Sequence, residues 1–152
     1  MELFTRCFNE AIRIQPPIYF STPHVMNEEV TINGLTIRKG DTFKIGMVHH
    51  CNSPSEWIEP EKFMPERWDS NSPLYLTPSG QKRNSYSFAP YTGGHRICVG
   101  MSVAQNISKT ILPSMLHHLK FKAIDPDFKM PYNNFYQRFN HVFNVKASPR
   151  RV

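Results

Sequence analysis

A glycine-rich loop around a single cysteine constrains this chain more than any other feature. The segment reads Phe88-Ala-Pro-Tyr-Thr-Gly-Gly-His-Arg-Ile-Cys-Val-Gly100, and three of the seven glycines lie at positions 93, 94 and 100. Such clustering indicates a backbone that passes close to something bulky. Cys98 follows His95 and Arg96 and opens an apolar pattern of helical period. Because helix N-termini and cations lower the pKa of a thiol, we expect a thiolate ligand for a soft metal, with haem iron the best candidate.

Other cysteines and the composition narrow the class of protein. The chain has 152 residues, of which 39% are hydrophobic, enough for one domain with a modest core. Cys7, Cys51 and Cys98 are odd in number and far apart, so we expect free thiols in a reducing compartment. For a lone cysteine, a buried free thiol in a glycine-rich turn is the alternative interpretation. No apolar run is long enough to span a bilayer, and no secretory signal is present.

The net charge of +6 is unevenly distributed along the chain. Residues 1–69 carry seven basic and ten acidic side chains, whereas residues 70–152 carry eleven basic and two acidic ones. The basic half contains the cysteine loop, so it could meet nucleic acid, anionic lipid or an acidic protein. Scattered basic residues argue against nucleic acid. A merely solvated surface is the alternative.

Local patterns predict several elements in the first half of the chain. Residues 2–15 have an amphipathic helical pattern that Pro16-Pro17 ends, and a helix so close to Met1 indicates a chain cut from something longer. Residues 25–32 and 35–37 flank Asn33-Gly34, which predicts a two-residue hairpin. After a turn at Lys39-Gly40-Asp41, residues 42–48 are expected to form a third strand.

The second half combines a long connection with a helix and short strands. Five prolines punctuate residues 49–87, and an ordered loop of this length is usually functional or packed against a specific surface. From Cys98 onward, apolar residues recur to position 119 as in a buried helix, which Pro113 should kink or interrupt. Residues 139–145 are expected to form a strand.

The cysteine loop resembles the haem-binding loop of the cytochrome P450 family, F-x-x-G-x-R-x-C-x-G. Gly94, Arg96, Cys98 and Gly100 match this pattern, and Tyr91 stands in the place of the usual phenylalanine. The resemblance implies that Cys98 is the axial ligand of haem iron. It also implies that Arg96 pairs with a haem propionate and that other loop residues lie at the cofactor, namely Gly94, Tyr91 and Phe88.

Two further motifs resemble the same family and occur in its order. Glu10-Ala-Ile-Arg13 resembles the E-x-x-R of the K helix, although such pairs alone are mostly surface ion pairs. The segment Trp57 to Trp68 resembles the family's W-x-x-P-x-x-F-x-P-E-R-F/W segment. The resemblance implies that Arg67 joins Glu10 and Arg13 in a buried network that fixes the region around the haem loop.

The resemblance implies a fold that is mainly α with small β-sheets (α+β), the incomplete C-terminal part of a cytochrome P450. Residues 1–152 would be one partial domain containing K helix, β-hairpin, meander, haem-binding loop, L helix and C-terminal strands. His24 stands where relatives carry a propionate ligand, although an ordinary loop histidine fits equally well. Residues 18–22 and 132–139 correspond to segments that line the family's substrate pocket, and their aromatic content fits an apolar substrate but equally fits ordinary core.

The implied activity is that of a haem-thiolate monooxygenase acting on an apolar small molecule with O₂. Electrons would come from NADPH through a flavoprotein reductase that docks on Lys82, Arg83 and Arg96, with no nucleic-acid partner. Full-length relatives would lie at the endoplasmic reticulum membrane, on its cytosolic face, through an N-terminal anchor absent here. No catalytic residue is assigned, because the oxygen-activating I helix is missing and this chain alone is expected to be inactive. The alternative is a non-catalytic haem-binding or interaction remnant.

Overall fold

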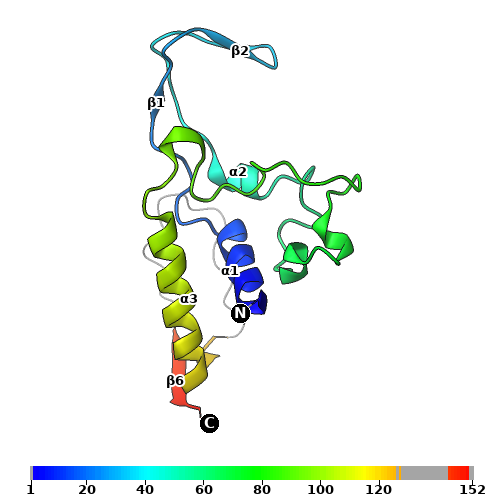
Figure 1. The fold of residues 1–152 in the computed structure, drawn as a ribbon, viewed down its shortest axis with the longest axis vertical. Coiled ribbons are helices and arrows are strands. Elements are labelled where there is room, and N and C mark those ends of the chain that lie inside the picture. The colour runs from blue at the N-terminus through cyan, green and yellow to red at the C-terminus, as the bar shows by residue number, and fades with distance from the viewer. Residues whose placement is uncertain (1, 126, 128–143, 151–152) are drawn as a thin grey trace. The chain divides into compact units, whose positions relative to one another are not determined.

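The computed structural model describes residues 2–125, 127 and 144–150 (Figure 1). These residues form two compact units, Met1–Cys98 and Val99–Val152, which are considered separately below. Helices and small antiparallel two-stranded sheets make up both units, as the predicted α+β class requires.

The first unit begins with helix α1, Glu2–Ile14, in agreement with the prediction. The Gln15 N–H still donates to the Ala11 carbonyl, and the following Pro16-Pro17 ends the helix because proline has no N–H. The fully buried residues of α1 are charged, namely Glu10 and Arg13. Its apolar side chains are half-buried or exposed, and Leu3 is 69% exposed. The helix is therefore anchored mainly through these two buried charged residues.

Strands β2, Val30–Ile32, and β3, Leu35–Ile37, form the predicted hairpin (Figure 1). Asn33 and Gly34 make its turn with φ of 50° and 83°, as the two positive values of a type I′ turn require. Across the strands, the Thr31 and Thr36 hydroxyls are 3.0 Å apart. The Asn-Gly prediction is confirmed.

The flanking strands are shorter than predicted. Strand β1, His24–Val25, pairs with β4, Thr42–Phe43, and the chain leaves the ladder before β2 begins. Residues 44–48 are not a strand, because the chain turns into helix α2, Met47–Cys51, which buries both of its terminal residues. The predicted strand over residues 42–48 is therefore confirmed only at Thr42–Phe43 and was wrong for residues 44–48. A short apolar run does not distinguish a strand from a buried helical turn.

The connection after α2 is irregular apart from two short 3₁₀ helices. These are η1, Pro65–Trp68, and η2, Pro73–Tyr75, each with proline at its start. Helix η1 packs against α1. Apart from prolines, only three apolar residues are buried among those described, Met47, Cys51 and Trp57, whereas Glu10, Arg13 and Arg67 are all fully buried. The centre of this unit is thus a charged cluster.

The second unit contains helix α3, Met101–His118, and strands β5, Leu119–Ala123, and β6, Val145–Pro149, which pair in antiparallel fashion. The helix begins at Met101 rather than at Cys98, with Gly100 as its N-cap. Pro113 lies inside it without ending it. Residues 139–143 of the predicted strand lie outside the described residues.

The predicted burial of α3 is not observed. None of its residues is buried, and Val103, Ile107 and Ile111 are each at least half exposed. A helical period shows which face is apolar but not whether another element covers it. Within the described residues, no helix is both long and apolar enough to cross a membrane.

Candidate functional site

The carboxylate of Glu10 accepts five hydrogen bonds at the centre of the first unit. Its Oε1 atom accepts from Arg13 Nη2 at 2.9 Å, Arg67 Nε at 3.0 Å and the Met64 backbone N–H at 3.0 Å. Its Oε2 atom accepts from Arg13 Nε at 2.9 Å and Trp68 Nε1 at 3.0 Å. The predicted trio of Glu10, Arg13 and Arg67 thus meets at one fully buried point.

Arg13 links α1 to the segments that follow α2. Its Nη1 atom donates to the Cys51 carbonyl and to Asn52 Oδ1, both at 3.0 Å. Its Nη2 atom also donates to the carbonyls of Pro60, at 2.8 Å, and Lys62, at 3.3 Å. Every guanidinium nitrogen of this buried arginine therefore has a partner, as a buried charge requires.

Arg67 donates from the other side of the same carboxylate. Its guanidinium also donates to the carbonyls of Ile58 and, at 2.7 Å, Glu59. Two buried cations thus share one carboxylate, and backbone carbonyl dipoles stabilise the excess positive charge. Such clusters contribute little net stability but strongly favour one geometry.

Opposing effects act on the pKa of Glu10. Burial raises it, but the hydrogen bonds from Arg13, Met64 and Trp68 together with the Arg13 charge outweigh burial and hold the pKa below its ordinary value. Burial lowers the pKa of Arg67 because it disfavours the charged guanidinium, and the Glu10 carboxylate partly opposes that change. Glu10 is therefore ionised at neutral pH.

Aromatic contacts lead from this network to the segment before the cysteine loop. Trp68, whose indole N–H donates to Glu10, packs against Trp57 with ring centroids 5.5 Å apart. The Phe88 ring meets Trp68 edge-on, with centroids 4.5 Å apart. Phe88, predicted at the cofactor, is thus half-buried in contact with Trp68.

The cysteine loop folds around a short 3₁₀ helix, η3, Gly94–Arg96. The Cys98 N–H donates to the Tyr91 carbonyl at 3.0 Å, which closes the loop across η3. Thr92 and Gly94 have φ of 66° and 67°, the left-handed region that glycine adopts most easily. Burial raises the pKa of Tyr91, and the nearby Cys98 side chain adds to this rise.

The exposed residues of this loop have three features expected of a loop that supplies the axial ligand of haem iron. Cys98 is a solvent-exposed free thiol and offers a soft sulfur donor. A Cβ atom at Gly94 would meet nothing within 4 Å, so the loop presents an open face there. Arg96 is exposed and could reach a carboxylate. In the described part of the chain, no three His, Cys, Asp or Glu side chains gather as a metal-ion site would need, but haem requires one axial donor.

His24 makes contacts of its own with strand β4. It is half-buried in β1, opposite Phe43 of β4, and the two rings stack with centroids 5.4 Å apart. No hydrogen bond of the described residues joins His24 to the loop. Its predicted role at a propionate remains a prediction.

One residue of the predicted basic docking surface has another role. Arg83 is half-buried, and its guanidinium donates to the carbonyls of Arg67, at 2.6 Å, and Leu74, at 2.8 Å. It also lies over the Trp57 ring, 4.3 Å from the centroid. Only Lys82 and Arg96 of that surface are exposed. No sequence pattern indicated this role of Arg83, because its partners are backbone carbonyls of residues earlier in the chain.

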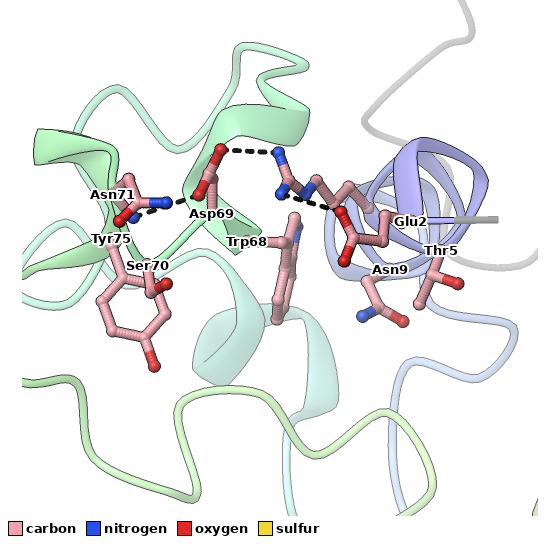
Figure 2. Close-up of a pocket in the computed structure, with 9 residues that line it drawn as sticks. Glu2, Thr5, Asn9, Trp68, Asp69, Ser70, Asn71 and Tyr75 are labelled. Carbon is pink, nitrogen blue, oxygen red and sulfur yellow. Dashed lines mark hydrogen bonds and ion pairs between the residues drawn. The ribbon is translucent and has the colours of Figure 1, made fainter.

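A pocket lies between α1 and the η1–η2 segment, away from the cysteine loop residues discussed above, as Figure 2 shows. It has a volume of about 600 Å³ and contains none of the predicted site residues. Its two carboxylates, Asp69 and Glu2, both pair with Arg6, at 2.7 and 3.7 Å. An Asn71 N–H bond and the Arg6 charge lower the pKa of Asp69, which makes this carboxylate a weak base. We therefore place the candidate site at the cysteine loop.

Comparison with known proteins assigns the family. The cytochrome P450 family model matches residues 1–144. The chain belongs to the cytochrome P450 family. Probable cytochrome P450 516A1 of Dictyostelium discoideum is 36% identical over 68% of this chain and 20% of its own length. Rat cytochrome P450 4F5 is 33% identical over 86% of this chain and 23% of its own.

Solved structures agree with this assignment. A zebra fish cytochrome P450 with progesterone superposes on 98% of this chain, with a TM-score of 0.75 and 25% identity, over 32% of its own length. A retinoic acid bound cyanobacterial CYP120A1 shares the fold with a TM-score of 0.72 over 83% of this chain. The described structure is therefore part of a P450 fold, and the chain spans less than a third of these relatives.

Replacing Glu10 by glutamine should destabilise the protein strongly. Glutamine keeps the shape but removes the negative charge, leaving Arg13 and Arg67 buried without a counter-ion. We expect the free energy of unfolding to fall by about 3–5 kcal/mol in urea denaturation. The matched control is Glu2→Gln in the same helix, because the Glu2 side chain is 90% exposed. A Glu10→Gln variant as stable as this control would contradict the role of the network.

The same carboxylate should make stability depend on pH. Because the folded-state pKa of Glu10 lies below its unfolded value of about 4.3, its contribution is present above that pH. The contribution is lost as pH falls through the folded pKa. Urea denaturation between pH 7 and pH 3 should show a shallower loss of stability in Glu10→Gln than in the parent. Equal slopes would contradict the lowered pKa.

Proposed function

We propose that this chain carries the proximal haem site of a P450 monooxygenase, with the Cys98 thiolate as axial ligand. The observation that supports it best is an exposed thiol on a loop closed by the Cys98–Tyr91 backbone bond and matched to the family's haem-loop pattern. Haem bound through a thiolate supplies reductive activation of O₂.

The surrounding residues have distinct roles in this proposal. Arg96 pairs with a haem propionate through its forked guanidinium, and His24 is a second propionate donor. Gly94 leaves room for the flat macrocycle, Tyr91 lies beside the sulfur, and Phe88 fixes the start of the loop on Trp68. Glu10, Arg13 and Arg67 hold the preceding segment in place.

The substrate and partners follow from the family. We propose an apolar organic substrate, oxidised with O₂ and with electrons that a flavoprotein reductase takes from NADPH. The exposed cations Lys82 and Arg96 would meet acidic groups of that reductase. The endoplasmic reticulum membrane, on its cytosolic face, is the proposed location of the full-length enzyme.

A second candidate is a haem-binding or interaction module without oxygenase activity, for these 152 residues acting alone. In this case haem binds at Cys98, but substrate is not turned over.

The absorption spectrum of the reduced, CO-bound protein tests thiolate ligation. After loading with haem, we expect a strongly red-shifted Soret band in the parent. That band should be lost in Cys98→Ala, because the sulfur donor is gone. Cys7→Ala is the matched control, since Cys7 lies half-buried on α1.

Each outcome of this experiment decides between the proposals. A parent without the red-shifted band, or a band unchanged in Cys98→Ala, would overturn ligation by Cys98. If the band is present, turnover of apolar test substrates with NADPH and a reductase distinguishes the monooxygenase from the non-catalytic module.

A further inference from the structure

We propose that Arg83 is a positioning residue for the Cys98 loop. Its hydrogen bonds attach the chain to η1 and η2 just before residues 84–88. This segment in turn contacts the backbone of the cysteine loop. The purpose of that positioning rests on the function proposed above, whereas the positioning itself can be measured without haem.

The first step is the anchoring of Arg83 itself. Its Nη1 atom donates to the carbonyls of Leu74, at 2.8 Å, and Leu76, at 3.3 Å. Its Nη2 atom donates to the Arg67 carbonyl at 2.6 Å. The guanidinium thus joins η1, η2 and the residue after η2, while its flat face lies over Trp57.

This set of contacts calls for arginine. A planar guanidinium can donate in two directions within its plane and stack on an aromatic ring with its face. A lysine ammonium has neither the fork nor the flat face. Arg83→Lys therefore keeps the charge but loses most of the geometry.

The second step is a set of local hydrogen bonds centred on the next residue, Asn84. The Asn84 N–H donates to Glu56 Oε2 at 2.9 Å, and Asn84 Oδ1 accepts from the Tyr86 N–H at 2.8 Å. The Asn84 carbonyl accepts from the Ser87 N–H at 2.9 Å and from its hydroxyl at 2.7 Å. Residues 84–87 thus take their position from the anchored residue 83.

The third step is contact with the cysteine loop. A Cβ atom at Gly93 would lie only 3.1 Å from Cε1 of the Tyr86 ring, so this ring packs directly on the loop backbone. Phe88 holds the same stretch of chain on Trp68. The loop is therefore fixed at two points, one leading to the Glu10 network and one leading to Arg83.

Hydrogen–deuterium exchange of the haem-free protein tests this inference. In Arg83→Lys, the amides of Ser87, Thr92 and Cys98, all hydrogen-bonded in the parent, should exchange about tenfold faster. Amides inside α1 should change by less than about twofold. Arg38→Lys, the same replacement at an exposed arginine, is the matched control and should leave all of these rates unchanged.

Tyr86→Ala is a second variant in case Arg83→Lys does not fold. The Tyr86 residue is 62% exposed, and its loss should speed exchange at Thr92 and Cys98 but not at Ser87. Unchanged loop exchange in either variant, or equal acceleration in the loop and α1, would overturn the positioning role.

The CO-bound spectrum then connects the two proposals. With haem loaded, Arg83→Lys should form a smaller fraction of the red-shifted species than the parent and Arg38→Lys. If the parent lacks this band, the proposed function fails while the exchange result stands. If the parent has the band and Arg83→Lys matches it in full, the positioning role for the haem ligand is wrong.

Discussion

A single buried carboxylate, that of Glu10, organises the first unit of this protein. Five donors converge on it from α1, from the backbone at Met64 and from η1. Few apolar residues are buried around it, so hydrophobic burial alone does not specify this arrangement. Because unpaired buried charges are costly, the hydrogen bonds from Arg13 and Arg67 to its carbonyls constrain the irregular chain between α2 and η1.

This network explains how a long irregular connection can hold the cysteine loop in a defined conformation. Residues 52–64 have no regular helix or strand, yet their carbonyls are fixed by two buried guanidinium groups. Trp68 extends the network to Phe88, and Arg83 extends it from the Arg67 carbonyl to the same stretch of chain. The exposed Cys98 thiol therefore stands on a loop whose support is almost entirely polar and aromatic.

The sequence predicted those features that depend on short spacing. Residues 10 and 13 share one face once residues 2–14 are helical, and Asn33-Gly34 specifies its turn locally. Family motifs also predicted that Arg67 would reach Glu10. What failed depended on distant partners: residues 44–48 of the predicted strand leave β4 and enter α2, and the apolar face of α3 is exposed. Arg83 was misassigned to the surface because its acceptors are carbonyls that only the folded chain brings near.

A double-mutant cycle between Glu10 and Arg67 tests most directly whether this carboxylate holds the distant segment in place. The free energies of unfolding of the parent, Glu10→Gln, Arg67→Gln and the double variant give the coupling energy between the two side chains. If the network acts as a unit, the second substitution should cost much less than the first, with a coupling of about 2 kcal/mol or more. Additive effects, with a coupling near zero, would contradict a structure organised around Glu10.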